Sequence, residues 1–508
     1  MRRALASGVL SRRLAGVLLH PTSLPGPYGA GDVGPAAERF LDLAQRAGLG
    51  IWQVLPIGPA GLGDCPYNSP SGFALAPELI SPDWLVEEGL VDAAQLRGLS
   101  RPSRSVADFR HARRARGAML EIAWLRSRRS RESSEGWTAG LGGWLEAHAW
   151  FTALRERFHQ PWWRWPEPWR HGPRAIEALN AGRQGDEALR ERASLHRYAQ
   201  GLAAAHWARL RGEARRRGVA LLGDLPIYPA YDSADVWSRP ELFQLDAQGL
   251  AGEVSGAPPD DLCPQGQKWG HALYRWPVIR GAGYAWWVER VRVALERFDA
   301  LRLDHFAGLD RYWSVPAEAI DASAGRWRLG PGAGLLRAVF EAMPGAQLFV
   351  EDLGELRPEA HRLRARFGLP GVRVAVDALG EGPAAEAHRP HRHGVNCVAY
   401  SSTHDTPTAK GWLAGQSGAA RARACRVLGA SAAGFADAVV AWTLGSPACS
   451  AVLAMQDVLG LGASARMNTP GEPLGQWRWR MRPEAWGAEA ADRLRERVEF
   501  AGRLRPTG

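Results

Sequence analysis

Eight short apolar runs recur along the chain, and stretches of helical periodicity separate most of them. The runs lack a strict alternation of apolar and polar residues, as strands buried on both faces of a sheet do. A strand followed by a helix, repeated about eight times, predicts an α/β fold of the (β/α)8 or TIM-barrel type. The runs are LAGVLL (14–19), IWQVL (51–55), VALLGDL (219–225), ALRLD (300–304), QLFVE (347–351), VRVAV (372–376), NCVAYS (396–401) and SAVLAM (450–455).

Polar segments rich in glycine and proline follow most of these runs directly. In a barrel they are the βα-loops of the carboxyl-terminal face, where active sites lie. Ordinary turn chemistry explains the glycines and prolines, but it does not explain why strands end in Asp, Glu and His. The segments are HPTSLPGPYG, PIGPAGLGD, PIYPAYDSAD, HFAGLD, DLGELRP and STHDTPT.

Two long insertions interrupt the barrel pattern. Residues 56–218 separate the second and third strands, and residues 226–298 separate the third and fourth. We expect both to form helical or loop subdomains that lean over the site. The predicted organisation is therefore an N-terminal tail at residues 1–13 and a single catalytic barrel at residues 14–508.

Composition and charge indicate a globular protein and argue against a nucleic-acid partner. The chain has 508 residues, 46% hydrophobic and 23% charged, which is typical of a globular protein. The net charge of +10 comes almost entirely from arginine, and we interpret the excess as codon bias on solvated surfaces. The densest basic segments, Arg110–Arg131 and Arg209–Arg217, resemble exposed faces of amphipathic helices, so we expect no nucleic-acid partner.

Cysteine usage and hydropathy address the cell compartment. Five scattered cysteines without a CxxC pair are typical of a reducing cytosol and argue against a zinc site. The longest uncharged run, between Asp437 and Asp457, contains a Gly-Ser-Pro break, which disfavours a membrane helix. No phosphate-binding glycine loop, GxSxG or HExxH motif is present. We therefore expect a cytoplasmic protein without a membrane segment, metal or cofactor.

Carboxylates end or follow several predicted strands, namely Asp224, Asp304, Glu351, Asp352 and Asp405. In a barrel these side chains converge on one pocket, where crowded charges shift one another's pKa values. Glycoside cleavage needs such a set: a nucleophile, an acid for the leaving oxygen, and negative charge near an oxocarbenium-like transition state. Aspartates that cap helices after strands would give the same spacing, so both interpretations stand at this point.

Tryptophan is the second chemical signal. The chain contains 23 tryptophans, clustered in WWRWPEPW at 162–169 and WRW at 477–479. Flat aromatic rings stack on the apolar faces of sugars, which favours a glucan cleft. We assign most of these residues to the core, and we expect Trp269, in a Gly-rich loop, to form a sugar platform.

A series of longer motifs runs from about Gly16 to Met481. They are GVLLHPTSLPGPYGAGDVG, DCPYNSPSGFA, WPEPWR, GDLPIYPAYDSADVW, GAPPDDLCPQGQKWGHALYRW, RLDHFAGLDRYWSVPA, EDLGELRPE, THDTPTAKGW, ARMNTPG and GQWRWR. As a full set in this order, they resemble the 4-α-glucanotransferases, or amylomaltases, of glycoside hydrolase family 77. The chain is similar to the compact bacterial members of that family.

The resemblance implies a cofactor-free, retaining enzyme. Such an enzyme transfers a segment of a 1,4-α-D-glucan to a new 4-position in glucose or another glucan. Asp304 in RLDHF resembles the family's nucleophile, Glu351 in EDLG its general acid/base, and Asp405 in THD the carboxylate that holds the distorted sugar. His305 and His404 resemble its sugar-hydroxyl donors. Further matches to positions lining the glucose subsites are Tyr67, Asp224, Gln267, Trp269 and Asn468.

Arg302 is expected to act on the nucleophile. It stands two residues before Asp304, and positions two apart on a strand share a face. Its guanidinium can therefore bond the Asp304 carboxylate and keep it ionised. Glu351, by contrast, should carry a proton before attack, with burial and neighbouring negative charge favouring the protonated form.

Two other functions remain open on the sequence. The first is an α-glucan hydrolase with the same three carboxylates, and the second is an inactive glucan-binding barrel. Transfer requires that a sugar hydroxyl capture the glycosyl-enzyme before water does, and we expect a covering loop at about residues 250–270 to favour this. The three carboxylates and Arg302 argue against the binding-only alternative. Maltooligosaccharides and other 1,4-α-glucans are the implied partners, and no feature indicates an oligomeric state.

Overall fold

The computed structural model describes residues 8–129, 138, 140–182, 184–260, 263–354 and 356–505. At its centre lies an eight-stranded parallel sheet in the order β10-β11-β12-β1-β2-β3-β6-β9. The strands are β1 (Leu14–Leu18), β2 (Ile51–Gln53), β3 (Ala220–Leu225), β6 (Ala300–Leu303), β9 (Leu348–Val350), β10 (Gly371–Val374), β11 (Cys397–Tyr400) and β12 (Ser450–Ala454).

The sheet is nearly closed on itself. The Val350 amide donates to the Pro370 carbonyl at 2.9 Å, which joins β9 to the residue before β10. Every position of β1, β2, β9, β11 and β12 is buried, as expected for strands enclosed by side chains within the barrel and by helices outside it. The (β/α)8 prediction is confirmed, and each of the eight apolar runs forms one strand.

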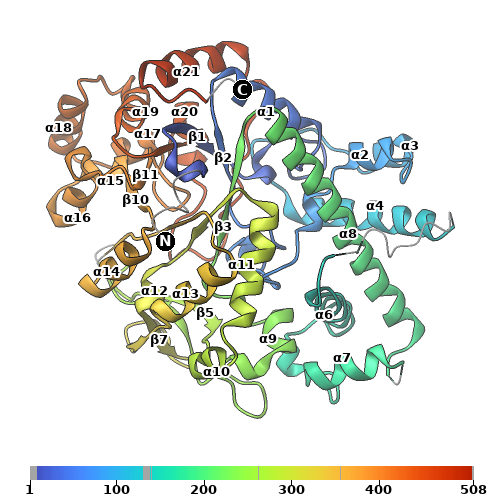
Figure 1. Cartoon of the computed structure of the whole chain (residues 1–508). Coiled ribbons are helices and arrows are strands. Elements are labelled where there is room, and N and C mark those ends of the chain that lie inside the picture. Colours follow the sequence, from blue (N-terminus) through green and yellow to red (C-terminus); the bar gives the residue numbers. More distant parts are fainter. Residues whose placement is uncertain are drawn as a thin grey trace.

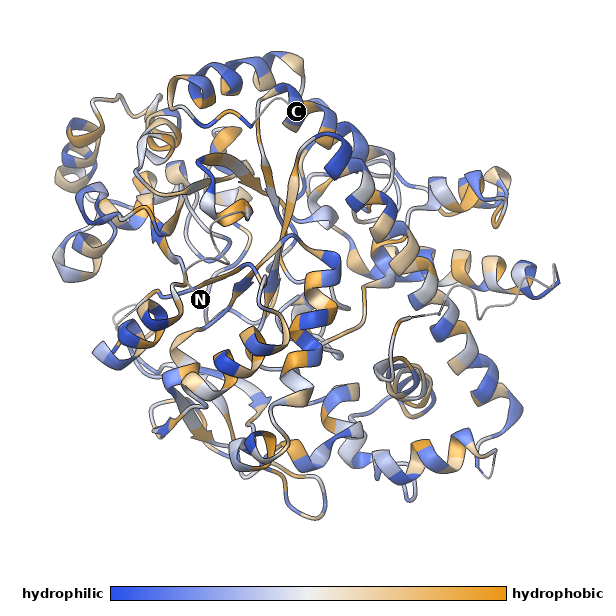
Figure 2. Cartoon of the chain, viewed as in Figure 1, coloured by the Kyte–Doolittle hydropathy of each residue, from blue (hydrophilic) through white to orange (hydrophobic). Residues whose placement is uncertain are grey.

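Amphipathic helices surround this sheet (Figure 1). In α1 (Pro35–Arg46) the buried residues are Ala37, Phe40, Leu41 and Ala44, a helical spacing that turns one face toward the barrel. Figure 2 shows the same division in other helices, with hydrophobic positions alternating with hydrophilic ones along each ribbon. The outer helices include α8 (Glu187–Arg216), α11 (Ala285–Arg297), α13 (Ala333–Ala342), α14 (Pro358–Phe367), α19 (Phe435–Gly445) and α21 (Ala488–Phe500).

The segment between β2 and β3 is predominantly helical in its described residues. Its longest helices before α8 occupy one side of the molecule in Figure 1. The helix α8 itself returns the chain to β3, and its buried residues pack on both the barrel and the insertion. The other helices of this segment are α2 (Pro82–Glu87), α3 (Ala93–Arg97), α4 (Phe109–Arg129), α6 (Trp144–Phe158) and α7 (Gly172–Asn180).

A second, four-stranded antiparallel sheet contradicts the expected covering loop. Its order is β5-β4-β7-β8, with β4 (Glu253–Ala257), β5 (Gln267–Ala272), β7 (Arg311–Pro316) and β8 (Arg326–Leu329). The expectation of a loop at 250–270 is wrong for the stretches that form β4 and β5, and Trp269 lies in β5. Pairing of β5 with β4 and of β4 with β7 supplies the backbone hydrogen bonds that hold these glycine-containing segments as strands.

The last described residues pack against the start of the first barrel strand. Residues 1–7 of the expected tail lie outside the described residues, and Val9–Ser11 forms a 3-10 helix with Leu10 buried. Near the other end, buried Arg503 donates to the carbonyls of Leu14 at 3.1 Å and Leu444 at 2.7 Å. None of the described helices has the length and apolar character needed to cross a membrane.

Candidate active site

Three polar clusters occupy the carboxyl-terminal end of the barrel strands. One is built on β3 and β6, one on the segment after β9, and one on the segment after β11. Contacts within and between these clusters connect every site residue expected from the sequence.

Arg302 holds two carboxylates together at the ends of β3 and β6. Its Nη1 lies 2.9 and 2.7 Å from the two carboxylate oxygens of Asp224 and 2.8 Å from Oδ1 of Asp304. The expected contact between Arg302 and Asp304 is therefore present. The Asp224 side chain is fully buried, whereas that of Asp304 is 24% exposed. Asp304 is thus the carboxylate of this pair that a ligand can reach, and a charge-assisted hydrogen bond from the guanidinium holds it.

Tyr67 completes the support of this cluster. Its hydroxyl donates to Oδ2 of Asp224 at 2.7 Å. Burial raises the pKa of Asp224, an effect that the charge of Arg302 opposes. Burial and the negative charge of Asp224 also hold the pKa of Tyr67 well above its ordinary value, so the phenol remains a hydrogen-bond donor. Asp224 and Tyr67 therefore fix Arg302 from behind while Asp304 faces outward.

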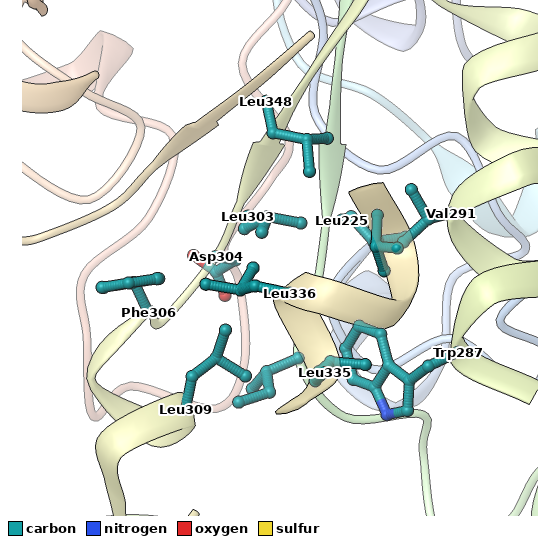
Figure 3. A pocket seen from close by; sticks show the side chains of 12 residues that line it. Leu225, Trp287, Val291, Leu303, Asp304, Phe306, Leu309, Leu335, Leu336 and Leu348 are labelled. Carbon is teal, nitrogen blue, oxygen red and sulfur yellow. The ribbon is translucent and has the colours of Figure 1, made fainter. Parts of the chain in front are cut away.

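An apolar layer supports the Asp304 segment on the helix side of the sheet (Figure 3). It leaves a residual cavity of only about 20 Å³, so the backbone that carries Asp304 is closely packed. The layer contains side chains from three neighbouring strands and from α11 and α13, namely Leu225, Leu303, Leu348, Trp287, Val291, Leu335 and Leu336.

Glu351 follows β9 and is held by backbone donors. The His305 amide donates to Oε2 at 3.0 Å, and the Leu353 amide donates to Oε1 at 2.7 Å. His305 has a φ of 49°, in the left-handed region that few non-glycine residues occupy. Burial raises the pKa of Glu351 to about 7; Arg302 opposes this rise and the charge of Asp304 adds to it. Near neutral pH this group can therefore both give and take a proton.

Asp405, in the loop after β11, has opposite surroundings. His404 Nε2 lies 3.1 Å from Oδ2, and Asn468 Nδ2 donates to Oδ1 at 2.6 Å. Burial acts to raise the pKa of Asp405, but His404 and Asn468 outweigh it and lower the pKa to about 2. The Asp405 side chain is 43% exposed, so it presents a permanent negative charge to the cleft.

Aromatic rings connect this cluster to Tyr67. The rings of Tyr67 and His404 stack at 5.1 Å, and that of Trp477 lies 5.6 and 5.8 Å from them. We did not assign Trp477 to the site from the sequence. Its signal was the WRW motif beside a glycine-rich turn, and its φ of 65° shows that the turn is tightly constrained.

The second sheet reaches the site through β5. Gln267 and Trp269 are two positions apart on this strand and share a face. Trp269 Nε1 donates to Oε1 of Gln267 at 3.1 Å, and its ring meets the ring of His305 edge to face at 4.8 Å. Because His305 follows Asp304 directly, β5 brings both side chains next to the reactive carboxylates.

Two details differ from the sequence interpretation. Asp352 does not join the site: its fully buried carboxylate lies 3.3 Å from Arg364 and 3.4 Å from Arg373, because consecutive residues point to opposite sides of the chain.

Cys65, by contrast, lies close enough to Asp304 and Asp405 for their charges to act on it. Burial, together with these charges, raises the pKa of the Cys65 thiol to about 11. No three His, Cys, Asp or Glu side chains in the described part of the chain are grouped to hold a metal ion.

Two neighbouring carboxylates define the class of protein. One carboxylate of the (β/α)8 barrel accepts a hydrogen bond from an arginine, and burial raises the pKa of a second to about 7. A retaining enzyme that cleaves glycosidic bonds requires this pair, because one group attacks the anomeric carbon and the other protonates the leaving oxygen.

Comparison with known proteins specifies the class further. The family model described as 4-alpha-glucanotransferase matches residues 19–485. The 4-alpha-glucanotransferase of Thermus thermophilus is 40% identical over 506 residues, which cover 97% of this chain and 99% of that protein. The 4-alpha-glucanotransferase of Aquifex aeolicus is 39% identical over 476 residues, covering 93% and 96%. The chain belongs to the 4-alpha-glucanotransferase family, glycoside hydrolase family 77.

Solved structures agree with this assignment. The amylomaltase from Streptococcus agalactiae in complex with acarbose superposes with a TM-score of 0.92 at 30% identity, covering 97% of this chain and 100% of that one. The amylomaltase from Corynebacterium glutamicum has a TM-score of 0.72 at 18% identity and covers 99% of this chain and 76% of that one. The second likeness concerns the fold alone.

Proposed function

We propose that the protein is a retaining 4-α-glucanotransferase acting on maltodextrins. It moves a 4-α-glucanyl segment from one 1,4-α-glucan to the 4-hydroxyl of glucose or of another glucan. The observation that carries this proposal is the pairing of Asp304 with Arg302 beside a Glu351 whose pKa is raised to about 7. Family membership supports the choice of an α-glucan as substrate.

The first half-reaction cleaves the donor. An Asp304 oxygen attacks the anomeric carbon as the bond to the glycosidic oxygen breaks, and Glu351 gives its proton to that oxygen. The leaving chain departs with a free 4-hydroxyl, and the enzyme retains the donor segment as a glycosyl ester. Arg302 suits this step, because its hydrogen bond keeps the attacking carboxylate in one orientation.

The second half-reaction transfers the segment. Glu351, now ionised, takes the proton from an acceptor 4-hydroxyl, whose oxygen displaces the Asp304 ester at the anomeric carbon. The two inversions at this carbon give net retention, and both Asp304 and Glu351 return to their starting protonation states. A Glu351 pKa near neutrality suits a group that must act as an acid in one half-reaction and a base in the other.

Asp405 and His404 hold the sugar ring. Asp405 is ionised at every physiological pH and accepts hydrogen bonds from ring hydroxyls, while the neighbouring His404 supplies a donor. The sugar hydroxyls become more polarised as positive charge develops on the flattening ring. Their hydrogen bonds to an anion therefore strengthen toward the transition state. Asn468 positions Asp405 through its 2.6 Å hydrogen bond.

The aromatic and amide side chains bind neighbouring glucose units. Trp269 and Tyr67 present ring faces that match the apolar faces of glucose, and Gln267 and His305 offer polar contacts nearby. Lys268 braces β5 by donating to the carbonyls of Ala317 and Ala319, each at 2.6 Å. A braced strand beside Asp304 restricts access of water and favours capture by a bound sugar over hydrolysis.

The proposal places the reaction in the cytoplasm and within a single catalytic barrel at residues 14–508, with the insertions at 56–218 and 226–298 contributing walls to the cleft. Five free cysteines support a reducing compartment. The eleven residues that would carry the reaction are Asp304, Glu351, Asp405, Tyr67, Asp224, Gln267, Trp269, Arg302, His305, His404 and Asn468.

Incubation with maltotriose tests the proposed reaction. The purified protein should convert maltotriose to glucose and a ladder of longer maltodextrins, with the total number of reducing ends unchanged. Chromatography over time and a reducing-end assay measure both quantities. A rise in reducing ends would show that water captures the glycosyl-enzyme and that the protein is a hydrolase. Unchanged maltotriose, maltopentaose and maltoheptaose in a folded sample would reject catalysis.

A further inference from the structure

A cavity unrelated to the carboxylates lies between α8 and α11. Its volume is about 320 Å³, which is large enough for a small metabolite. Its polar and aromatic lining consists of two tryptophans, three arginines and one glutamate, namely Trp144, Trp207, Arg211, Arg215, Arg297 and Glu296. Arg211 and Arg215 belong to the basic segment 209–217, which takes no part in the proposed reaction.

Arg297 is the distinctive group in this lining. Its Nη1 donates to the Phe73 carbonyl at 2.6 Å, and its guanidinium carbon lies 5.9 Å from the centre of the Trp144 ring. Among the described residues no carboxylate lies within ion-pair distance of Arg297; the charge of the adjacent Glu296 acts on it, but that carboxylate is paired with Arg292. Burial lowers the pKa of Arg297 to about 10, so the group remains a cation at neutral pH. A largely buried cation without an ion-pair partner is unfavourable unless an anion joins it.

The other two arginines leave the cavity with an excess of positive charge. Arg211 and Arg215 share one carboxylate, that of Asp299, at 3.1 and 3.3 Å. Asp299 also accepts the Leu221 amide at 2.9 Å, so its capacity is divided among three donors. The Arg215 side chain is 59% exposed, so its guanidinium is accessible at the rim, whereas that of Arg211 is 17% exposed and also donates to the Phe298 carbonyl at 3.4 Å.

We propose that this cavity, called here the arginine cavity, binds the phosphate ester of a small ring-bearing metabolite. Planar guanidinium groups donate paired hydrogen bonds to phosphate oxygens, and three arginines against one glutamate leave the lining with net positive charge. Trp144 and Trp207 provide an apolar wall for a sugar or base ring. The chemistry is shared by hexose phosphates and nucleotides, which the experiment separates.

The geometry favours a small anion over a nucleic acid. The three guanidinium groups converge on one concave volume, whereas a nucleic-acid surface requires a basic stripe that follows a phosphate backbone. On the same helix, Arg216 is 67% exposed and pairs with Glu213, outside the cavity lining. It therefore offers a matched control for loss of one positive charge on α8.

Isothermal titration calorimetry of the full chain tests the proposal, with glucose 1-phosphate, AMP, inorganic phosphate and neutral glucose as separate probes at constant ionic strength. We expect saturable binding of at least one of the two phosphate esters at an affinity that glucose does not reach. Arg297→Gln should weaken that binding by at least about tenfold, because it removes a charge-assisted contact. Arg216→Gln should leave it unchanged, and thermal melts of both variants establish that they are folded.

The probes also identify the source of the phosphate. Tighter binding of glucose 1-phosphate supports a sugar phosphate, and tighter binding of AMP supports a nucleotide. Absence of binding by both esters would overturn the proposal, as would binding of inorganic phosphate alone. Equal losses in Arg297→Gln and Arg216→Gln would also overturn it, because they would indicate general attraction to a basic surface. Preferential binding of an oligonucleotide in a competition arm would replace it with a nucleic-acid site.

Discussion

Glu351 and Asp405 follow β9 and β11 at the same end of the barrel and both feel the charge of Arg302, yet their pKa values lie about five pH units apart, at about 7 and about 2. Burial acts to raise both values. The β9 side surrounds its carboxylate with two neutral amides and the negative charge of Asp304, whereas the β11 side adds a histidine and an asparagine. The identity of the neighbours, more than burial itself, divides the roles of the two groups.

Removal of the proposed nucleophile is expected to have the largest effect. Asp304→Ala should lower the rate of maltotriose disproportionation by at least about a thousandfold, since Asp224, the other carboxylate bound to Arg302, is fully buried. Initial rates measure the loss, and circular dichroism verifies folding. Near-normal turnover in a folded variant would remove Asp304 from the mechanism.

Glu351→Gln separates the acid from the nucleophile. With maltotriose as donor, the rate should fall by about a thousandfold, because the leaving oxygen requires a proton. With an α-maltosyl fluoride donor, fluoride leaves without protonation, so the first half-reaction should be far less impaired. Fluoride release in a single turnover measures this step, and Asp304→Ala serves as the control that loses it with both donors. Equal losses in Glu351→Gln with both donors would contradict the acid role.

Asp405→Asn tests the carboxylate that follows β11. The substitution keeps the shape and the contact with Asn468 but removes the negative charge, so kcat/KM should fall by roughly a hundredfold. Unlike Glu351→Gln, this variant should lose activity to a similar extent with maltotriose and with the fluoride donor. A selective loss with maltotriose would place Asp405, and not Glu351, in the acid role.

The pH dependence sharpens the same contrast. Glu351 must enter the reaction protonated, so kcat/KM should decline above about pH 7, by about tenfold per pH unit. Asp405 must be ionised, and its pKa of about 2 puts the corresponding acid decline below the pH range in which the protein is assayed. A profile measured from pH 4 to 9 should show the alkaline limb, and Glu351→Gln should lack it. A wild-type alkaline limb retained in that variant would assign it to another group.

The smallest effect on catalysis is expected at Asp352, the neighbour of Glu351. Asp352→Asn weakens the contacts with Arg364 and Arg373 on the far side of the chain, and should reduce the free energy of unfolding by about 2–4 kcal/mol. Because these contacts lie outside the site, kcat/KM should remain within about threefold of the wild-type value. Denaturant melts and initial rates measure the two effects. A large loss of kcat/KM with unchanged stability would contradict the structural role.

The barrel was predictable because its strands are buried runs bounded by turn-forming residues, a pattern that survives in a single sequence. The second sheet was not. Strands β4 and β5 contain Gly256 and Gly270; they pair with each other, and β4 also pairs with β7, which begins only at Arg311. Such long-range pairing leaves no local periodicity, and Trp269 was therefore placed in a loop.

The site was partly predictable in the same way. The spacing of Arg302 and Asp304 determines that they share a face, and the structure contains their hydrogen bond. The same alternation of side chains puts Asp352 on the side opposite Glu351. The expectation that all five carboxylates converge on one pocket did not take this into account. The position of Trp477 in the site depends on a tight turn that brings its ring next to His404. The spacing of residues in the sequence does not predict that contact.

Mass spectrometry of the glycosyl-enzyme tests the central claim most directly. Glu351→Gln incubated with α-maltosyl fluoride should accumulate the covalent intermediate, because the first half-reaction needs no acid and the second lacks its base. Tryptic digestion yields the peptide LDHFAGLDR, which spans residues 303–311, and fragmentation distinguishes Asp304 from Asp310. The account predicts a maltosyl ester on Asp304. An ester on Asp405, or fluoride release without any adduct, would contradict it.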